Sequence, residues 1–298
     1  MSTKKYKYTK DNVYLTEVQR DFYEENGYIV FRNLVDFNLL DECTNRFLEY
    51  CDGKVNTGYY VKVIKDMSLK NTDAKGEFLI NKIQDFNYDD ILFKYISYKP
   101  LVDIVQSIIG PNVTAAHSML INKPPNSEKN TSRHPLHQDL HCFPFRPAEL
   151  IVASWTAMEK VDEKNGCLFV MPGSHKGTLL EHEYPPNVTN PGYRGVLGLE
   201  HIPTVNLVME KGDTVFFHPL LFHGSGPNLT KGFRKALSVH YGANNCNFIN
   251  VTPKMDKVAL YHAKTKGFPE VTFNLYWKAK SRIVRGEPGN FQNLRSQL

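Results

Sequence analysis

The chain has 298 residues, of which 41% are hydrophobic, and its 36 Lys and Arg against 31 Asp and Glu give a net charge of +5. This apolar fraction is enough to bury a sizeable core, which excludes an intrinsically disordered chain, and the charge excess is too small to indicate a nucleic-acid-binding protein. The five cysteines stand at scattered spacings that form neither a zinc motif nor a disulfide framework, which favours a reducing compartment.

No targeting or membrane segment is predicted from the first residues or from the apolar stretches. Residues 1–12 are polar and rich in Lys, and no apolar run follows them, so we expect no secretory signal. Two long stretches without Asp, Glu, Lys or Arg, 214–230 and 236–253, contain His, Pro and Asn, which a membrane-spanning helix would rarely carry. We therefore expect an intracellular protein without a membrane span.

Three helices are predicted in the first 110 residues, each with apolar residues at helical spacing and a residue that commonly caps or opens a helix. They begin at Thr16 (in a capping box with Gln19), Asp36 and Pro100, and end at Asn26, Cys51 and Ile109. The weakly patterned segment 52–75 is predicted to be an ordered loop.

After residue 111 the pattern changes to short apolar or alternating runs that are separated by Gly, Pro and Asn turns. The predicted strands are 113–122, 151–158, 167–171, 205–209, 214–217 and 236–242. Such a series favours an antiparallel sandwich or small barrel with helices packed outside. We expect one domain over 1–298, with a mainly helical part at 1–110, a β core at 111–245 and a C-terminal extension at 246–298.

Residues 137–139 read His-Gln-Asp, which is the only His-x-Asp in the chain. In an extended backbone the side chains of His137 and Asp139 point to the same face and can reach one ion. His223 is the best candidate for a third ligand, because it ends an apolar run and precedes a Gly-Ser-Gly-Pro turn, with His218 as its rival. Two histidines and one carboxylate form the facial triad of non-haem Fe(II) sites, which leaves open coordination positions.

Arg234 follows His223 by eleven residues, across a turn and the start of a returning strand that could bring it beside the ligands. A guanidinium pairs bidentately with a carboxylate, and a buried arginine without such a partner would be costly. Behind an iron site, this arginine indicates a keto acid co-substrate whose far end is a carboxylate. Without the triad, Arg234 would be read as a surface residue.

Four longer motifs resemble those of the phytanoyl-CoA dioxygenase family of Fe(II)/2-oxoglutarate oxygenases. They are HQDLHCFPFRP at 137–147, NGCL at 165–168, MPGSHKG at 171–177 and EKGDTVFFHPLLFHGSG at 210–226. The resemblance covers most of the chain and is strongest over 82–241. It implies a double-stranded β-helix (jelly-roll) core, mainly β with flanking helices, and N-terminal helices packed against one sheet.

Carried over residue by residue, the resemblance makes His137, Asp139 and His223 the iron ligands and the catalytic centre. Around 2-oxoglutarate it places Arg234, Ser225, Lys82, Trp155 and Met119. Ser225 and Lys82 suit polar contacts, whereas Met119 and Trp155 suit apolar walls that keep the site dry. The remaining histidines are interpreted as structural, with His141 a candidate for an outer contact of Asp139.

The resemblance also implies the reaction, in which 3-methyl-branched acyl-CoA, 2-oxoglutarate and O₂ give the 2-hydroxyacyl-CoA, succinate and CO₂ in fatty acid α-oxidation. The implied cofactor is Fe(II), with ascorbate as a candidate reductant that maintains it. Related enzymes that accept halide lack the carboxylate ligand, so the presence of Asp139 predicts hydroxylation. The phosphates of CoA imply a basic rim, for which the candidates are Lys62, Lys65, Lys70, Lys123 and Arg146.

Three alternatives stay open at this point. The same ligands could hold zinc in a hydrolase, the scaffold could serve as a non-catalytic acyl-CoA-binding protein, or the oxygenase could act on another acyl-CoA or a small-molecule acid. The tripeptide Ser296-Gln297-Leu298 resembles a peroxisomal address, so the peroxisomal import receptor is an expected partner and the peroxisome, otherwise the cytoplasm, the expected location.

Overall fold

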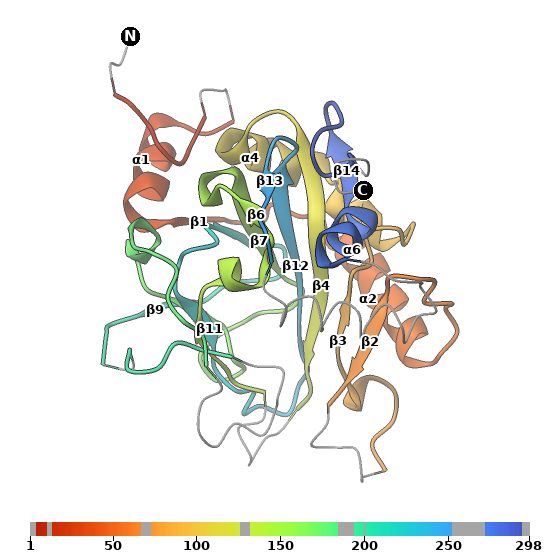
Figure 1. Ribbon diagram of the computed structural model, residues 1–298. Coiled ribbons are helices and arrows are strands. Elements are labelled where there is room, and N and C mark those ends of the chain that lie inside the picture. Colours follow the sequence, from red (N-terminus) through yellow and green to blue (C-terminus); the bar gives the residue numbers. More distant parts are fainter. Residues whose placement is uncertain are drawn as a thin grey trace.

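The computed structural model describes residues 4–10, 14–66, 73–125, 132–183, 194–199, 201–251 and 272–293. These residues form a large and a small antiparallel sheet with a shared core between them, and helices cover the outer face of the large sheet. In Figure 1 the long strands β4 and β12 run through the middle, with β9 and β11 of the small sheet on one side and helix α2 on the other.

The larger sheet has the order β1, β10, β7, β12, β4, β3, β2, and β14 also pairs with β4. Its strands are β1 (Tyr28–Phe31), β2 (Lys62–Lys65), β3 (Ile80–Gln84), β4 (Val113–Lys123), β7 (Ile151–Ala157), β10 (Thr214–Phe217), β12 (Arg234–Ala243) and β14 (Arg282–Arg285). The smaller sheet has the order β5 (His134–His137), β11 (His223–Ser225), β8 (Leu168–Val170) and β9 (Val205–Leu207). Strands β6 (Phe145–Arg146) and β13 (Asn247–Phe248) form a separate pair.

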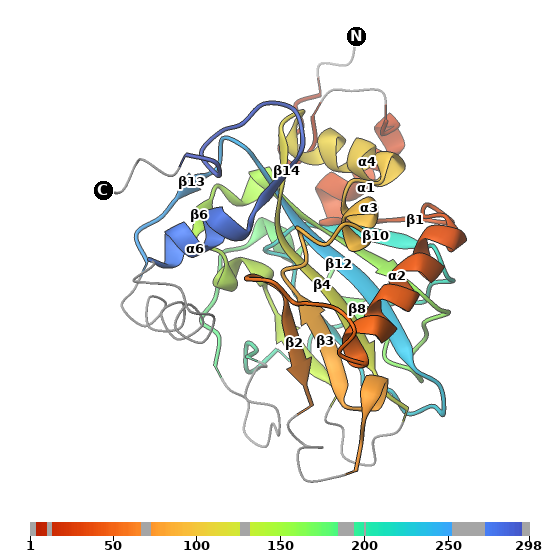
Figure 2. The same ribbon diagram turned by 90° about the vertical axis from the view of Figure 1, so that its right-hand side faces the viewer.

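The three predicted helices are confirmed as α1 (Glu17–Asn26), α2 (Phe37–Cys51) and α4 (Lys99–Ile109). Thr16 and Gln19 form the expected capping box, and Gly27 ends α1 with a left-handed φ of 76° that favours glycine. Two further helices, α3 (Leu92–Ile96) and α6 (Phe273–Lys280), were not predicted. Figure 2 shows α2 and α3 along the outer face of the large sheet. Among these described helices, none is both long and apolar enough to cross a membrane.

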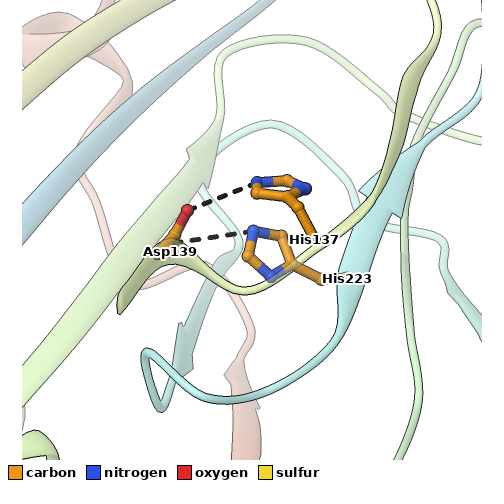
Figure 3. Close-up of side chains that lie close together, drawn as sticks. All are labelled: His137, Asp139 and His223. Carbon is orange, nitrogen blue, oxygen red and sulfur yellow. Dashed lines mark ion pairs between the residues drawn. The ribbon is translucent and has the colours of Figure 1, made fainter. Parts of the chain in front are cut away.

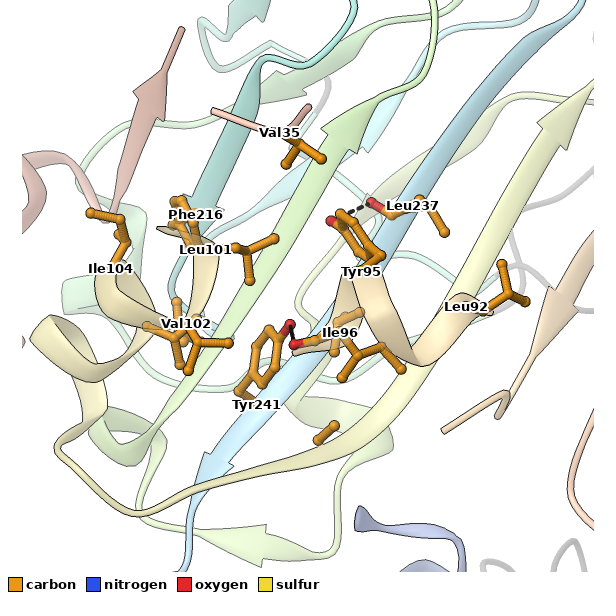
Figure 4. Close-up of a cluster of buried hydrophobic side chains, with 14 of the residues drawn as sticks. Val35, Leu92, Tyr95, Ile96, Leu101, Val102, Ile104, Phe216, Leu237 and Tyr241 are labelled. Carbon is orange, nitrogen blue, oxygen red and sulfur yellow. Dashed lines mark hydrogen bonds between the residues drawn. The ribbon is translucent and has the colours of Figure 1, made fainter. Parts of the chain in front are cut away.

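The central strands of the large sheet are buried on both faces, and each face has a different role. Leu237, Val239 and Tyr241 of β12 pack with the helices α3 and α4 (Figure 4), where the Tyr241 hydroxyl donates to the Ile96 carbonyl at 2.8 Å. Because side chains alternate along a strand, Arg234, Ser238 and His240 point to the opposite face, toward the small sheet. One face therefore anchors the helices and the other provides a polar interior.

The prediction of only helices and loops in the first hundred residues is wrong at β1, β2 and β3. The segment 52–75, predicted as a loop, contains β2, and β3 joins it to the edge of β4. These strands have four or five residues and weak alternation, so long-range pairing with the sheet defines them rather than local pattern. His223 also differs from the expectation, because it begins β11 of the small sheet instead of ending the run from β10.

Candidate metal centre

A cavity of about 60 Å³ lies between the two sheets. All eight site residues predicted from the sequence line it. Strands β5 and β11 of the small sheet contribute His137, His223 and Ser225, and the short helical turn that follows β5 contributes Asp139. The large sheet contributes Lys82, Met119, Trp155 and Arg234. Residues that are up to 152 positions apart in the chain thus face one space.

His137, Asp139 and His223 converge at one end of this cavity (Figure 3). The Nε2 atom of His137 lies 3.3 Å from Asp139 Oδ1, and Nε2 of His223 lies 3.6 Å from Asp139 Oδ2. Three ligand atoms that are each about 2.1 Å from one ion, at adjacent octahedral positions, would lie about 3 Å apart. The side chains therefore stand close to the spacing that a shared metal ion requires.

The backbone explains how the three side chains are brought together. His223 of β11 is the register partner of His137 of β5, so the two imidazoles lie side by side on paired strands. Gln138 keeps an extended conformation, which turns Asp139 to the same side as His137. Gly224 permits this close pairing, because a Cβ there would come within 2.8 Å of the His134 carbonyl oxygen.

The protonation of the triad suits a cation. Nδ1 of His137 lies 2.9 Å from the Pro135 carbonyl oxygen and Nδ1 of His223 lies 3.0 Å from the Leu221 carbonyl oxygen. Each Nδ1 therefore carries the proton and each Nε2 presents a lone pair to the cavity. Burial lowers the pKa of His223 to about 4. Burial alone would raise the pKa of Asp139, but the neighbouring His223 and His240 rings hold it well below the usual value.

Arg234 lies at the start of β12 and is 1% exposed. Its guanidinium carbon is 5.5 Å from the centre of the Trp155 ring, and both residues line the cavity that contains the triad. Met119 and Trp155 flank Ser238 as its register partners on β4 and β7, so they form part of the wall on the large sheet. The cavity therefore has a metal-ligand end, a cationic group and apolar walls.

Lys123 is a cavity residue that the sequence did not assign to the site, although it was a candidate for a CoA-binding rim. It is the register partner of Arg234, is 4% exposed, and donates from Nζ to Ser225 Oγ at 2.8 Å and to the Gly226 carbonyl oxygen. Burial, and then the neighbouring Arg234 charge, hold the pKa of Lys123 well below the usual lysine value. The alternation of β4 could have revealed it, since Met119, Ile121 and Lys123 share one face.

Two of the other rim candidates, Lys62 and Arg146, form contacts within the fold. Lys62 pairs with the buried Asp85 at 3.2 Å, and Arg146 donates to the carbonyl oxygens of Phe143 and Phe145. Lys65 is exposed, and Lys70 lies outside the described residues. The contacts of the described rim candidates do not identify a binding site for CoA phosphates.

The remaining histidines separate into two groups. The rival ligand His218 packs against the rings of Tyr8 and His175, and it is not among the residues that line the cavity. His134, interpreted from the sequence as structural, lines the cavity and stacks on His137 with ring centres 3.9 Å apart. The hydrogen bond to Asp139 comes from His240, whereas Nδ1 of the expected outer contact His141 faces the Gln138 carbonyl oxygen.

Solved structures with a similar fold include EctD from S. alaskensis with 2-oxoglutarate and 5-hydroxyectoine (TM-score 0.61, 16% identity, 81% of each chain covered). Another is the epimerase SnoN in complex with Fe³⁺, alpha ketoglutarate and nogalamycin RO (TM-score 0.59, 17% identity, 77% of this chain and 84% of that one). At these identities the likeness concerns the fold, and it confirms the predicted jelly-roll core.

The sequence itself matches known proteins far more closely. The phytanoyl-CoA dioxygenase (PhyH) family pattern matches residues 23–236. The peroxisomal phytanoyl-CoA dioxygenase of Homo sapiens is 45% identical over 96% of this chain and 87% of its own length, and that of Rattus norvegicus is 46% identical over 95% and 86%. A probable phytanoyl-CoA dioxygenase of Caenorhabditis elegans is 44% identical over 95% of this chain and 97% of its own length. The chain therefore belongs to the phytanoyl-CoA dioxygenase family.

Proposed function

We propose that this chain is an Fe(II)- and 2-oxoglutarate-dependent dioxygenase that hydroxylates C2 of 3-methyl-branched fatty acyl-CoA in fatty acid α-oxidation. The observation that carries the proposal is the convergence of His137, Asp139 and His223 in the same cavity as the buried Arg234. The substrate class follows from the names of the relatives that are 44–47% identical.

The triad fits a ferrous ion through its donor set and its protonation. Two neutral imidazoles and one ionised carboxylate would hold the ion on one side and leave open positions for a chelating keto acid and dioxygen. When bound, the ion supplies the oxidative chemistry, in which 2-oxoglutarate loses CO₂ and becomes succinate while one oxygen atom enters the acyl chain. The backbone hydrogen bonds at both Nδ1 atoms orient the rings, so little reorganisation accompanies metal binding.

The other end of the cavity suits the far carboxylate of 2-oxoglutarate. Arg234 would bind this carboxylate through two parallel N–H bonds, and Ser225 would add a hydroxyl donor. Lys123 donates to Ser225 Oγ, which leaves the hydroxyl hydrogen of Ser225 available for the carboxylate of the co-substrate. Lys82 extends the polar wall, whereas Met119 and Trp155 exclude water from the reacting groups.

The experiment that tests the function is reconstitution of the purified chain with Fe(II) and 2-oxoglutarate without oxygen, followed by admission of O₂. We expect succinate release coupled to a 2-hydroxyacyl-CoA product with 3-methyl-branched acyl-CoA, and much less with a straight chain of equal length. Equal rates with other acyl-CoAs or small acids would contradict the substrate assignment. Thioester hydrolysis with Zn²⁺ and without oxygen uptake would favour a hydrolase, and binding of acyl-CoA without turnover would favour a carrier.

In the same assay, Arg234→Met is expected to raise the KM for 2-oxoglutarate by about 30-fold or more, since truncation of a buried charge pair costs about 2–5 kcal/mol. Arg234→Lys keeps the charge but loses the fork geometry, so it should fall between the wild type and Arg234→Met. An unchanged KM in Arg234→Met would remove this residue from the co-substrate site.

The location of the protein is a separate proposal. The curated relatives of rat and human are named as peroxisomal, which supports a peroxisomal location for this chain. The sequence predicts an import signal at the tripeptide 296–298. This tripeptide lies outside the described residues. A full-length chain with an N-terminal fluorescent tag should enter peroxisomes, and removal of 296–298 should leave it in the cytosol if the import receptor binds there.

A further inference from the structure

His240 contacts a triad member in a way that the proposed function does not use. Its Nε2 atom lies 2.8 Å from Asp139 Oδ2, an oxygen that is also 3.6 Å from His223 Nε2, whereas Oδ1 of the same carboxylate faces Nε2 of His137 at 3.3 Å. The His240 side chain is 2% exposed, lines the cavity, and lies on the same face of β12 as Arg234. The two oxygens of Asp139 therefore have different neighbours.

The ring of His240 is held firmly in this position. His117 is its register partner on β4, and the two rings stack with centres 5.7 Å apart and planes inclined by 20°. Asp85 fixes His117 in turn, because its Oδ1 lies 2.6 Å from His117 Nδ1. Phe143 packs edge-on against His240 at 4.9 Å, and the pairing of β12 with β4 shifts register directly after His240, where Ala116 is the extra residue on β4.

The hydrogen-bonding environment assigns the proton of His240. A neutral imidazole carries one N–H, and Nδ1 of His240 is buried without a hydrogen-bond partner among the described residues. Nε2 instead faces a carboxylate oxygen, which is a strong acceptor. The N–H is therefore at Nε2 and donates to Asp139 Oδ2.

This contact affects how many positions the metal keeps open. A carboxylate can bind a cation through one oxygen or through both. In a six-coordinate site, a single-oxygen Asp139 leaves three positions, enough for a chelating keto acid and dioxygen, whereas a two-oxygen Asp139 leaves only two. Resting on the proposed function, we propose that His240 is a positioning residue. Its hydrogen bond engages Oδ2, which leaves Oδ1 to the metal and keeps Asp139 a single-oxygen ligand.

A matched pair of amide variants tests this role. The terminal NH₂ of Gln lies about as far along the side chain as Nε2 of His, whereas that of Asn is one methylene shorter and cannot reach Asp139. We expect His240→Asn, saturated with Co(II), to bind 2-oxoglutarate about 10–100-fold more weakly than the wild type, with an altered Co(II) absorption spectrum. His240→Gln should restore the affinity to within a few-fold and recover the spectrum. The protein concentration is taken as that of bound Co(II), so unfolded protein without metal does not affect the measured affinity.

The results distinguish a failure of the role of His240 from a failure of the proposed function. Wild-type affinity and spectrum in His240→Asn would overturn the role of His240, and so would equal impairment in both variants, which would point to ring packing. A wild-type chain that binds neither Co(II) nor 2-oxoglutarate would instead contradict the proposed function.

Discussion

Asp139→Ala is expected to abolish succinate release that depends on acyl-CoA. The substitution removes the only anionic ligand of the triad, so the loss of metal affinity should exceed the roughly 10–100-fold that an outer contact costs. It also removes the hydrogen-bond partner of His240, whose Nε2 lies 2.8 Å from Asp139 Oδ2. Metal content by mass spectrometry and succinate release with saturating 2-oxoglutarate measure the two effects.

His218→Gln provides the matched control for this result. His218 was the rival third ligand in the sequence, and it is buried beside Tyr8 and His175 instead of lining the cavity. This variant should still bind one metal ion per folded chain and retain turnover. Full turnover in Asp139→Ala, or loss of metal in His218→Gln with the fold intact, would contradict the ligand assignment.

The sequence predicts the parts of the site that depend on local pattern. The extended Gln138 brings His137 and Asp139 to one face, as the alternation of side chains along an extended backbone requires. The capping residues Thr16 and Asp36 likewise mark the helices where the structure has them. These features depend on residues that are at most four positions apart, so a pattern in the chain can carry them.

The missed features depend on pairing between distant segments. Strands β5 and β11 have four and three residues without alternation, and they exist because His137 and His223 pair across the small sheet. The predicted strand 113–122 ends before Lys123, which precedes two prolines, yet β4 continues through Lys123 to pair with Arg234. His240 had a usable signal, since it lies six residues after Arg234, an even spacing that puts both residues on one face of β12.

A second cluster of charges lies outside the cavity and supports the fold. Asp85, which is 1% exposed, contacts Lys280 Nζ at 2.7 Å and Lys62 Nζ at 3.2 Å, as well as His117. Lys280 is the last residue of α6 and is itself 2% exposed. The carboxylate thus joins β2, β3, β4 and the C-terminal helix through buried ionic contacts.

Asp85→Asn is expected to lower the free energy of unfolding by about 3–5 kcal/mol, because it leaves the buried ammonium of Lys280 and the partly buried one of Lys62 without their anion. The Asp85 backbone has a φ of 61°, a conformation that Asn tolerates well, so strain should not contribute. Urea unfolding followed by circular dichroism measures the change. Asp103→Asn is the matched control, since the partners of Asp103, Lys99 and Arg285, are largely or partly exposed, and its cost should be about 1 kcal/mol or less.

The pH dependence distinguishes lost charge from lost packing. Burial alone would raise the pKa of Asp85, but the Lys280 ammonium, followed by His117 and Lys62, holds it well below the usual value. Because the folded pKa lies below the unfolded one, the contribution of the ionised group is complete above the ordinary Asp value of about 3.9 and is lost as the pH falls below it. The part of the stability gap between the wild type and Asp85→Asn that comes from the Asp85 charge should therefore narrow as the pH falls below about 3.9. A gap that keeps its full size at pH 3 would mean that the shape of the side chain, rather than its charge, stabilises this junction.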